Sequence, residues 1–229
     1  DHARGSEKYG VRAEGAGREY KKMADRKTKV IRKLVAGVGL KMKNAGVQVV
    51  KAEALIEGRS EEGLIRISAA GETYEAKNLL LCTGSETFIP PIPGINLLEN
   101  DAIVTNRELL AMKESPSSLV IIGGGVIGME FASLYNSLGV EVHVIEMLPE
   151  ILGALDKEIS AMLRARYAKK GVHFHLSCRV TGVEGHKVVF VDPDGVEQAV
   201  DGDKILVSVG RRPVTQGLGL ENLGVELER

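Results

Sequence analysis

The feature that most constrains the fold is a glycine-rich loop between an apolar run and an amphipathic segment. Residues 119–122 are all apolar, as in a strand buried on both faces of a sheet. The glycine loop occupies 123–128, and helical periodicity continues over 126–138. A second apolar run at 140–145 follows after a short break. This order predicts one parallel strand, helix and strand unit, and therefore an α/β fold.

The loop has the spacing G-x-G-x-x-G, and each glycine has a physical role in that pattern. Gly123 permits a tight turn, Gly125 lets backbone amides approach a pyrophosphate, and Gly128 lets the helix pack closely on the sheet. The free amides and positive dipole end of the helix then favour an anion. Glu146 ends the second strand, where its carboxylate can accept hydrogen bonds from a ribose diol. The pattern predicts a dinucleotide site.

The acid at the end of the second strand also bears on which dinucleotide binds. The charge of Glu146 would repel a 2′-phosphate, and no Arg or Lys occurs between Glu146 and Asp156. NAD is therefore favoured over NADP. The alternative is a structural glycine turn with a surface glutamate, which leaves the shared register of strand, loop, helix and acid unexplained.

Composition excludes several classes of function. The net charge of −1 gives no global field for nucleic acid or an anionic membrane, and the longest apolar runs are only strand-sized. The polar start at 1–4 resembles no signal peptide, so a cytoplasmic location is expected. Cys82 and Cys178 are too far apart for a metal or short redox pair and are expected to be buried, reduced thiols.

The region before the glycine loop has two kinds of pattern. A basic segment at 18–38 carries apolar residues at near-helical spacing, which predicts a helix with one buried stripe and a solvated basic face rather than a nucleic-acid patch; the stripe comprises Met23, Val30, Ile31, Leu34 and Val38. Strands are predicted at 47–50, 63–68 and 79–82. The proline-rich loop 89–94 is typical of a domain crossing, which places a boundary near Leu98.

Further elements are predicted around the strand, helix and strand unit. Thr105 and Glu108 form a capping-box pattern for a short helix, and Asp156 can cap a helix that ends at Gly171. The second helix is expected to bury one face, made of Ile159, Met162, Leu163 and Tyr167. An antiparallel insertion is predicted from strands at 172–176, 187–191 and 196–200. A further strand, at 204–209, is predicted to return to the main sheet.

Three weaker signals have both structural and functional interpretations. Thr83, Gly84 and Ser85 follow an apolar run, either as an ordinary turn or as a ligand turn at a strand's carboxyl end. His173 and His175 alternate on a predicted strand, but with no third ligand expected nearby we predict no metal site. His2, His143 and His186 show no pattern. Glu130 is either a surface helix residue or a neighbour of the nicotinamide path.

Several motifs, taken together in their order, carry a resemblance to a known family. They are the run 120–130, the segment 79–85, the glycine and proline stop at 209–213, and the ending Leu-Gly-Leu-Glu-Asn-Leu-Gly-Val at 218–225. In these the chain resembles the dihydrolipoyl dehydrogenases, which are class I pyridine nucleotide-disulfide oxidoreductases. The resemblance covers nearly the whole chain.

The resemblance implies an architecture and a set of cofactor contacts. Residues 99–214 would form a Rossmann-like NAD-binding domain with a central parallel sheet and an antiparallel β-meander. Residues 1–98 would form the second part of an interrupted FAD-binding domain, and residues 215–229 would return toward that FAD domain. The implied NAD contacts are Gly123, Gly124, Gly125, Val126, Ile127, Gly128, Met129 and Glu130 at the pyrophosphate, Glu146 at the ribose, and Val180 and Gly210 in the cleft. The implied flavin contacts are Thr83, Gly84 and Ser85, with Ala52 standing where relatives often have a glycine.

The resemblance also implies chemistry that this chain does not contain. Such enzymes oxidise a dithiol through a C-x-x-x-x-C disulfide, pass electrons through FAD to NAD, and use a histidine supported by glutamate as base. None of these parts is present, so no catalytic residue is expected here and the chain is expected to be an internal fragment that binds NAD without redox activity. The implied partners are a lipoyl-bearing protein of a 2-oxoacid dehydrogenase or glycine-cleavage complex and a second copy in a homodimer. A related FAD-dependent disulfide reductase, a pyridine nucleotide transhydrogenase and a non-catalytic NAD-binding module remain open as alternatives.

Overall fold

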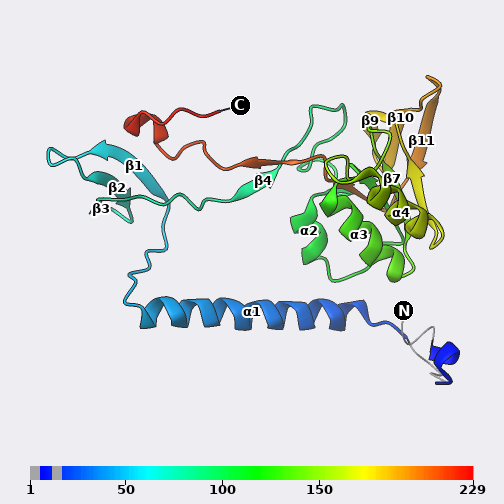
Figure 1. Ribbon diagram of the computed structural model, residues 1–229, viewed down its shortest axis with the longest axis horizontal. Helices are drawn as coiled ribbons and strands as arrows, with labels where there is room; N and C mark the ends of the chain where they lie inside the picture. The colour runs from blue at the N-terminus through cyan, green and yellow to red at the C-terminus, as the bar shows by residue number, and fades with distance from the viewer. Residues whose placement is uncertain (1–5, 12–16, 229) are drawn as a thin grey trace. The chain divides into compact units, whose positions relative to one another are not determined.

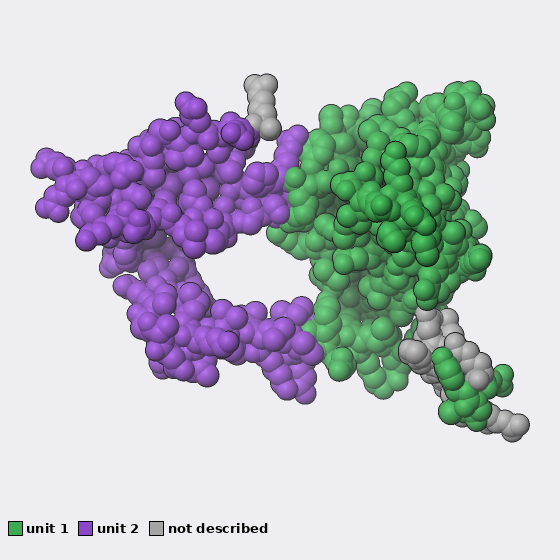
Figure 2. Space-filling view, in the orientation of Figure 1, with its two compact units in different colours: residues 1–27, 87–211 green, residues 28–86, 212–229 purple. Residues whose placement is uncertain are grey.

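A computed structural model describes residues 6–11 and 17–228 (Figure 1). The polar start of the chain at 1–4, including His2, lies outside the described residues. The chain divides into two compact units, shown in different colours in Figure 2. Unit 1 comprises residues 1–27 and 87–211, and unit 2 comprises residues 28–86 and 212–229.

Unit 1 is built on a five-stranded parallel sheet. In spatial order its strands are β5 (Ile103–Val104), β12 (Lys204–Val207), β6 (Ser118–Ile122), β7 (Glu141–Ile145) and β8 (Val172–His175). The central strands are apolar on both faces because layers cover both sides of the sheet. The predicted strands at 119–122, 140–145 and 204–209 are confirmed, as is the α/β fold class.

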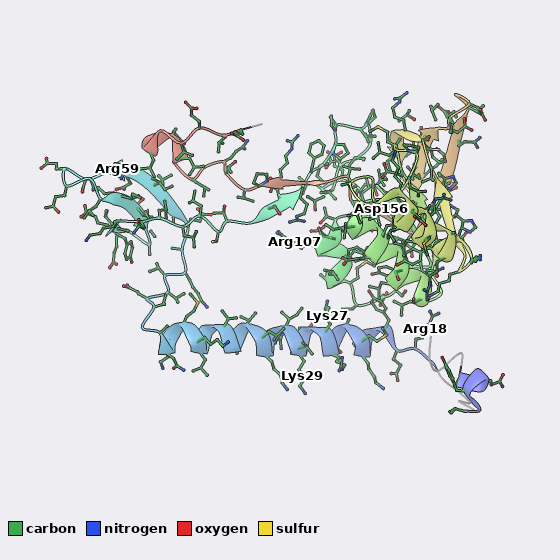
Figure 3. The ribbon with its side chains drawn as sticks, viewed as in Figure 1. Arg18, Lys27, Lys29, Arg59, Arg107 and Asp156 are labelled. Carbon is green, nitrogen blue, oxygen red and sulfur yellow. The ribbon has the colours of Figure 1, made fainter. Side chains whose placement is uncertain are left out.

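Three helices lie within residues 87–211 of unit 1, and the predicted caps of two of them are confirmed. They are α2 (Asn106–Ala111), α3 (Val126–Ser137) and α4 (Lys157–Ala168). Thr105 caps α2 in a complete capping box with Glu108, and the Asp156 carboxylate caps α4 (Figure 3). Side chains of α2 and α3 pack with alternate residues of β6 and β7 into one buried cluster, so the helices cover one face of the sheet.

An antiparallel meander covers the opposite face of the sheet. Its strands are β9 (Arg179–Glu184), β10 (Lys187–Val191) and β11 (Glu197–Asp201). The prediction that 172–176 belongs to this insertion is wrong, because β8 pairs in parallel with β7. The strand that was missed is β9. The chain leaves β7, runs back along the sheet through α4 and then enters β8. Such a crossover connection makes β8 parallel to β7.

The buried face of α4 differs from the predicted one. Ile159 and Met162 are 58% and 64% exposed, while Leu163 and Tyr167 pack against the helical core. Ser160 is buried with 1% exposure and lies three and seven residues before Leu163 and Tyr167, so it shares their face of the helix. The helix is therefore turned so that a small polar residue, rather than Ile159 or Met162, faces the core.

The proline-rich loop packs on unit 1. Ile89, Ile95 and Leu97 contact the buried cluster beneath the meander, and the Val183 amide donates to the Pro93 carbonyl at 2.9 Å. These contacts hold the loop in unit 1, and the compact units divide between 86 and 87. The domain boundary near Leu98 stays a prediction.

Unit 2 is a small antiparallel sheet with a short 3₁₀-helix. Its strands are β1 (Ala54–Arg59), β2 (Ile65–Ala69) and β3 (Glu72–Ala76), and η2 (Leu220–Leu223) packs against them. Ile56 ties the segments together, since its amide donates to Leu218 O at 2.9 Å and its carbonyl accepts from Asn222 Nδ2 at 2.8 Å. The strand predicted at 63–68 is confirmed.

Two predicted strands of this region are wrong. Residues 47–50 and 79–82 form no strand. The strand that follows 79–82 is the short β4 (Ser85–Thr87), which pairs with β13 (Arg211–Pro213). No strand is recorded beside either segment in the part of the chain that the structure describes. A strand is stable only when a neighbouring strand accepts its backbone hydrogen bonds, so apolar composition alone was insufficient.

The amino-terminal region contains η1 (Ser6–Tyr9) and the long helix α1 (Tyr20–Asn44). The predicted helix is confirmed, but its predicted buried stripe is wrong, because no residue of α1 is buried. Met23, Val30 and Leu34 are 44%, 44% and 66% exposed, and Lys27 and Lys29 project from opposite sides of the helix (Figure 3). Among the described residues, every helix falls short of the length or hydropathy needed to cross a bilayer.

The buried hydroxyl of Ser160 generates a stability prediction. Its Oγ has no hydrogen-bond partner among the described residues, which leaves a desolvated polar group in α4. Ser160→Ala removes that group and adds the residue of highest helix propensity, so we expect the free energy of unfolding to rise by about 1 kcal/mol. Urea denaturation followed by circular dichroism measures this change. Ser133→Ala in α3, at a half-buried position, is the matched control, and an equal gain there would refute the role of the buried hydroxyl.

Candidate functional site

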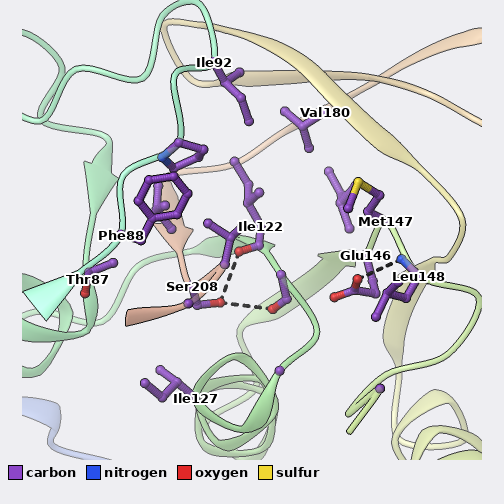
Figure 4. Close-up of a pocket in the computed structure, with 18 of the residues that line it drawn as sticks. Thr87, Phe88, Ile92, Ile122, Ile127, Glu146, Met147, Leu148, Val180 and Ser208 are labelled. Carbon is purple, nitrogen blue, oxygen red and sulfur yellow. Dashed lines mark hydrogen bonds between the residues drawn. The ribbon is translucent and has the colours of Figure 1, made fainter. Parts of the chain in front are cut away.

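A cavity opens where the strand order of unit 1 changes direction. After β6 the chain proceeds through β7 to β8 on one side, whereas β12 and β5 lie on the other side. The loops that leave the carboxyl ends of β6 and β12 therefore diverge, which is where open α/β sheets form ligand crevices. A cavity of about 780 Å³ lies here (Figure 4). Phe88, Ile92, Met147 and Val180 give part of its wall an apolar surface.

The turn after β6 requires glycine at two positions. Gly123 has φ +104°, and a Cβ there would lie 2.6 Å from the carbonyl oxygen of Ser208. A Cβ on Gly128 would lie 2.2 Å from the carbonyl oxygen of Gly123. The first glycine thus lets the chain turn beside β12, and the last lets α3 press against the turn.

Gly125 differs because its surroundings are open. It is the N-cap of α3 and supplies no side-chain hydrogen bond, and a Cβ there would meet nothing within 4 Å. Gly125, Val126 and Ile127 all line the cavity. Since the first-turn amides of a helix have no partner within the helix, the amino end of α3 presents donors and a positive dipole end at the cavity.

Glu146 lies half-buried directly after β7, on the adjacent wall. Its Oε2 accepts from the Gly124 amide at 2.5 Å, and its Oε1 accepts from the Leu148 amide at 2.8 Å. These two bonds fix the carboxylate beside the glycine turn, and Figure 4 shows the bond to Leu148. An ionised carboxylate has about four lone-pair sites, so about two remain for a ligand.

Ser208 and Arg179 are among the cavity residues that sequence reasoning missed. Ser208 Oγ lies 3.1 Å from the Ile122 carbonyl and 3.0 Å from the Gly123 carbonyl, both of which accept, so it holds β12 to the glycine turn (Figure 4). A serine in the otherwise apolar run 205–209 was the available signal. Arg179 brings a cation to the lining, and no sequence pattern connected it with Glu146.

The predicted NAD contacts fall into three groups. The first group lines the cavity and comprises Gly123, Gly125, Val126, Ile127, Glu146, Val180 and Gly210. Gly124, Gly128 and Met129 are buried behind that surface, and Met129 is part of the helical core. Glu130 is exposed on α3 and is not among the residues lining the cavity.

The predicted flavin contacts lie in unit 2. Ala52, Thr83, Gly84 and Ser85 are all exposed. Thr83 Oγ1 donates to the Val214 carbonyl at 2.6 Å, and the Val214 amide donates to the Gly84 carbonyl at 3.0 Å. These two hydrogen bonds hold the turn to Val214, at the start of the carboxyl-terminal segment of unit 2.

The two cysteines occupy different units. Cys178 lines the cavity of unit 1 but is only 4% exposed, and its Sγ contacts the Leu176 carbonyl at 3.2 Å. Burial, followed by the charge of Asp192, raises the pKa of the Cys178 thiol, which keeps it protonated. Cys82 is a free, exposed thiol in unit 2, so its expected burial is wrong.

A cluster of donor side chains lies on β7 and β8. The ligand atoms of Glu141, His143 and His173 all lie within 4.8 Å of one another, so the expectation that His173 has no further ligand nearby is wrong. His175 lies beside them. Burial, followed by the charges of His143 and His173, lowers the pKa of His175. The sequence analysis did not identify Glu141 and His143 as further ligands, because it did not predict that β7 pairs with β8.

Comparison with known proteins places the chain in a family. Residues 5–229 match the family described as pyridine nucleotide-disulphide oxidoreductase. The chain is 38% identical over 223 residues to a dihydrolipoyl dehydrogenase of Acholeplasma laidlawii, covering 96% of this chain and 64% of that protein. It is 36% identical to the dihydrolipoyl dehydrogenase of Bacillus subtilis, covering 99% of this chain and 48% of that protein.

Solved structures give the same result. LpdA from Mycobacterium tuberculosis matches with a TM-score of 0.79 and 28% identity, covering 93% of this chain and 47% of that one. The HOCl-induced flavoprotein disulfide reductase RclA from Escherichia coli matches with a TM-score of 0.79 and 25% identity, covering 92% and 47%. The chain thus spans between about half and 64% of the relatives it matches. From its fold, its glycine turn and these matches, the chain belongs to the pyridine nucleotide-disulphide oxidoreductase family.

Proposed function

We propose that the cavity of unit 1 binds NAD(H), and that the chain is the NAD-binding portion of a dihydrolipoyl dehydrogenase. One observation carries this proposal. The same cavity is lined by Gly125, at the unobstructed amino terminus of α3, and by Glu146, whose carboxylate is held in place by hydrogen bonds. Amide donors suit a diphosphate, and a carboxylate with free lone pairs suits a vicinal diol. The two groups therefore match the two chemically distinct parts of one dinucleotide.

Each residue of the site has a defined task in this proposal. The amides at the start of α3 hold the pyrophosphate, and Glu146 accepts hydrogen bonds from the adenosine ribose. Val180 and Gly210 line the path to the nicotinamide, and exposed Glu130 acts beyond the cavity rim. NAD supplies hydride transfer when bound, while the apolar wall of the cavity excludes water from the reacting ring.

Unit 2 takes a second role in the proposal. Ala52, Thr83, Gly84 and Ser85 would contact FAD, and the exposed turn at 83–85 offers backbone groups for that purpose. The corresponding domain assignment is 1–98 and 215–229 for the FAD domain and 99–214 for the NAD domain. The structure of unit 1 supports including 87–98 with the NAD domain instead.

The whole protein would oxidise protein-bound dihydrolipoamide through a disulfide and FAD and reduce NAD. Cys82 and Cys178 lie 96 positions apart in different units, so they are not the C-x-x-x-x-C pair that such chemistry uses, and this chain alone would not be redox-competent. Its partners would be a second copy in a homodimer and a lipoyl-bearing protein of a 2-oxoacid dehydrogenase or glycine-cleavage complex. Two free cysteines favour a reducing compartment such as the cytoplasm.

Gly125→Val tests the pyrophosphate site. A Cβ there has nothing within 4 Å and lies in open space in front of α3, so the chain should fold while NADH affinity falls at least about 100-fold. Fluorescence titration with NADH measures affinity. The change of N-cap costs about 1 kcal/mol, so thermal unfolding should move only slightly.

Gly128→Ala is the contrasting control for that experiment. Its Cβ would lie 2.2 Å from the Gly123 carbonyl oxygen, so overpacking should lower the free energy of unfolding by about 1–3 kcal/mol. Undiminished NADH binding by folded Gly125→Val chain would refute the loop assignment.

Glu146→Gln tests the ribose site and the choice of cofactor. Loss of charge-assisted hydrogen bonds, each about 1.5–3 kcal/mol, should weaken NADH binding about 10- to 100-fold and narrow the preference over NADPH. Parallel titrations with both cofactors measure the ratio of affinities. Arg179→Gln is the companion variant, since Arg179 is a cation of the lining. A wild-type preference for NADPH that Arg179→Gln abolishes would contradict the role given to Glu146.

The redox proposal is tested on the full-length protein. We expect bound flavin absorbance and NAD reduction with dihydrolipoamide, and NADH binding without either activity in the 229-residue chain. A full-length protein that binds flavin but transfers hydride only between nicotinamide nucleotides would be a transhydrogenase, and one that reduces a different disulfide would be a related reductase.

A further inference from the structure

Four donor side chains gather on one face of the parallel sheet, away from the glycine turn. Glu141 and His143 are alternate residues of β7 and therefore point to the same face. His173 on β8 is paired with His143, so it shares that face, and His175 follows at the next alternate position. These four residues are called the histidine cluster. They lie at the edge of the sheet, because β8 is its last strand.

The spacing of the donor atoms suits a metal ion. His143 Nε2 lies 3.2 Å from Glu141 Oε1, close to the roughly 3.3 Å that separates two donors about 2.0–2.1 Å from one tetrahedral zinc ion. His173 adds a third ligand atom, and all three lie within 4.8 Å of one another. Two donors on one ion lie at most about 4.2 Å apart, so a small side-chain rotation completes the set. Glu141 and His173 are exposed and have room for it.

We propose that Glu141, His143 and His173 bind one divalent transition-metal ion of the Zn²⁺ class, with solvent at the fourth position. Two imidazoles and a carboxylate suit zinc, and two nitrogen donors disfavour the all-oxygen sites of Mg²⁺ and Ca²⁺. This site is additional to the proposed NAD cavity. Its donors begin at the start of β7, whereas the cavity opens around Ile145 and Glu146 at the end of that strand.

His175 acts as the positioning residue of this site. His143 Nδ1 lies 3.2 Å from His175 Nε2. When a metal ion is bound, Nδ1 of His143 would carry the proton and donate it to His175, which would leave the Nε2 lone pair for the ion. The His175 ring is itself fixed against Phe190 of the meander, with ring centroids 5.0 Å apart. His143 and His173 stack with centroids 4.6 Å apart, which restricts the rotation of both ligands.

The test is a titration of the 229-residue chain, without a polyhistidine tag, with Co²⁺ and then Zn²⁺. Visible absorption of Co²⁺ reports coordination by protein nitrogen, and Zn²⁺ displaces it. Cys82→Ser is the background variant, because Cys82 is the exposed one of the two free thiols and a thiolate would itself bind Co²⁺ or Zn²⁺. We expect one equivalent of Co²⁺, displaced by Zn²⁺ and not by excess Mg²⁺.

Variants then assign the site to its residues. His173→Gln and Glu141→Gln alter exposed side chains and should each weaken Zn²⁺ binding at least about tenfold, with an unchanged circular dichroism spectrum. His186→Gln is the matched control, an exposed histidine on the meander whose Nδ1 contacts the Gly202 carbonyl, and it should leave affinity within twofold. Absence of stoichiometric binding, full affinity in His173→Gln, or an equal loss in His186→Gln would each overturn the proposal.

Discussion

The arrangement of unit 1 depends on how closely α3 approaches the end of β6. The helix reaches that position only because Gly128 has no side chain where the Gly123 carbonyl lies, at 2.2 Å from where a Cβ would be. Ser208 contacts the same carbonyl from β12, and the Glu146 carboxylate accepts from the next amide along the turn. The segments that follow β7 and β12 and the start of α3 thus all meet the turn after β6 at the Gly123 carbonyl and the Gly124 amide. The position of the helix amino terminus follows from this contact, and with it the direction in which its unpaired amides point.

The layers on both sides of the sheet explain why this turn is rigid. Alternate residues of the central strands pack either with the helices or with the meander, so neither face is left to solvent at β6. A strand buried on both faces is held by apolar packing in addition to its hydrogen bonds. The loops at the carboxyl ends diverge on top of this fixed base. The sheet therefore gives the base of the cavity a fixed position, while loop residues such as Phe88, Ile92 and Met147 form part of its wall.

The sequence predicted the parts of the fold in which local pattern and long-range packing agree. In the unit of β6, α3 and β7, the apolar runs, the glycine spacing and the acid each predict locally the structure that the folded sheet requires. The caps at Thr105 and Asp156 were predictable because a cap involves residues only two or three positions apart. The errors fall where the partner is remote. Strand β8 was assigned to the wrong sheet, because its pairing with β7 depends on a crossover and not on its own residues.

Other failures have the same origin. The apolar residues of α1 were expected to be buried because they recur at helical spacing, but periodicity does not specify a surface to cover them. The segment 79–82 is apolar enough for a strand, yet Leu80 is 85% exposed and the segment has no strand pairing in the residues described. At the site, the sequence could identify Gly125 and Glu146 from one motif. It could not identify Ser208 or Arg179, since these come to the cavity only through the order of the strands.

The backbone of Glu146 has a consequence of its own for local dynamics. Its amide donates to the His175 carbonyl at 2.8 Å, and its carbonyl accepts from the Cys178 amide at 2.9 Å. These two hydrogen bonds join its main chain to the end of the edge strand β8 and to the residues that follow it. Edge strands separate from a sheet at lower free energy than central ones. Slow hydrogen–deuterium exchange at Glu146 and Cys178 should therefore share one opening event, and the acid at the cavity would lose its backbone support whenever the margin of the sheet frays.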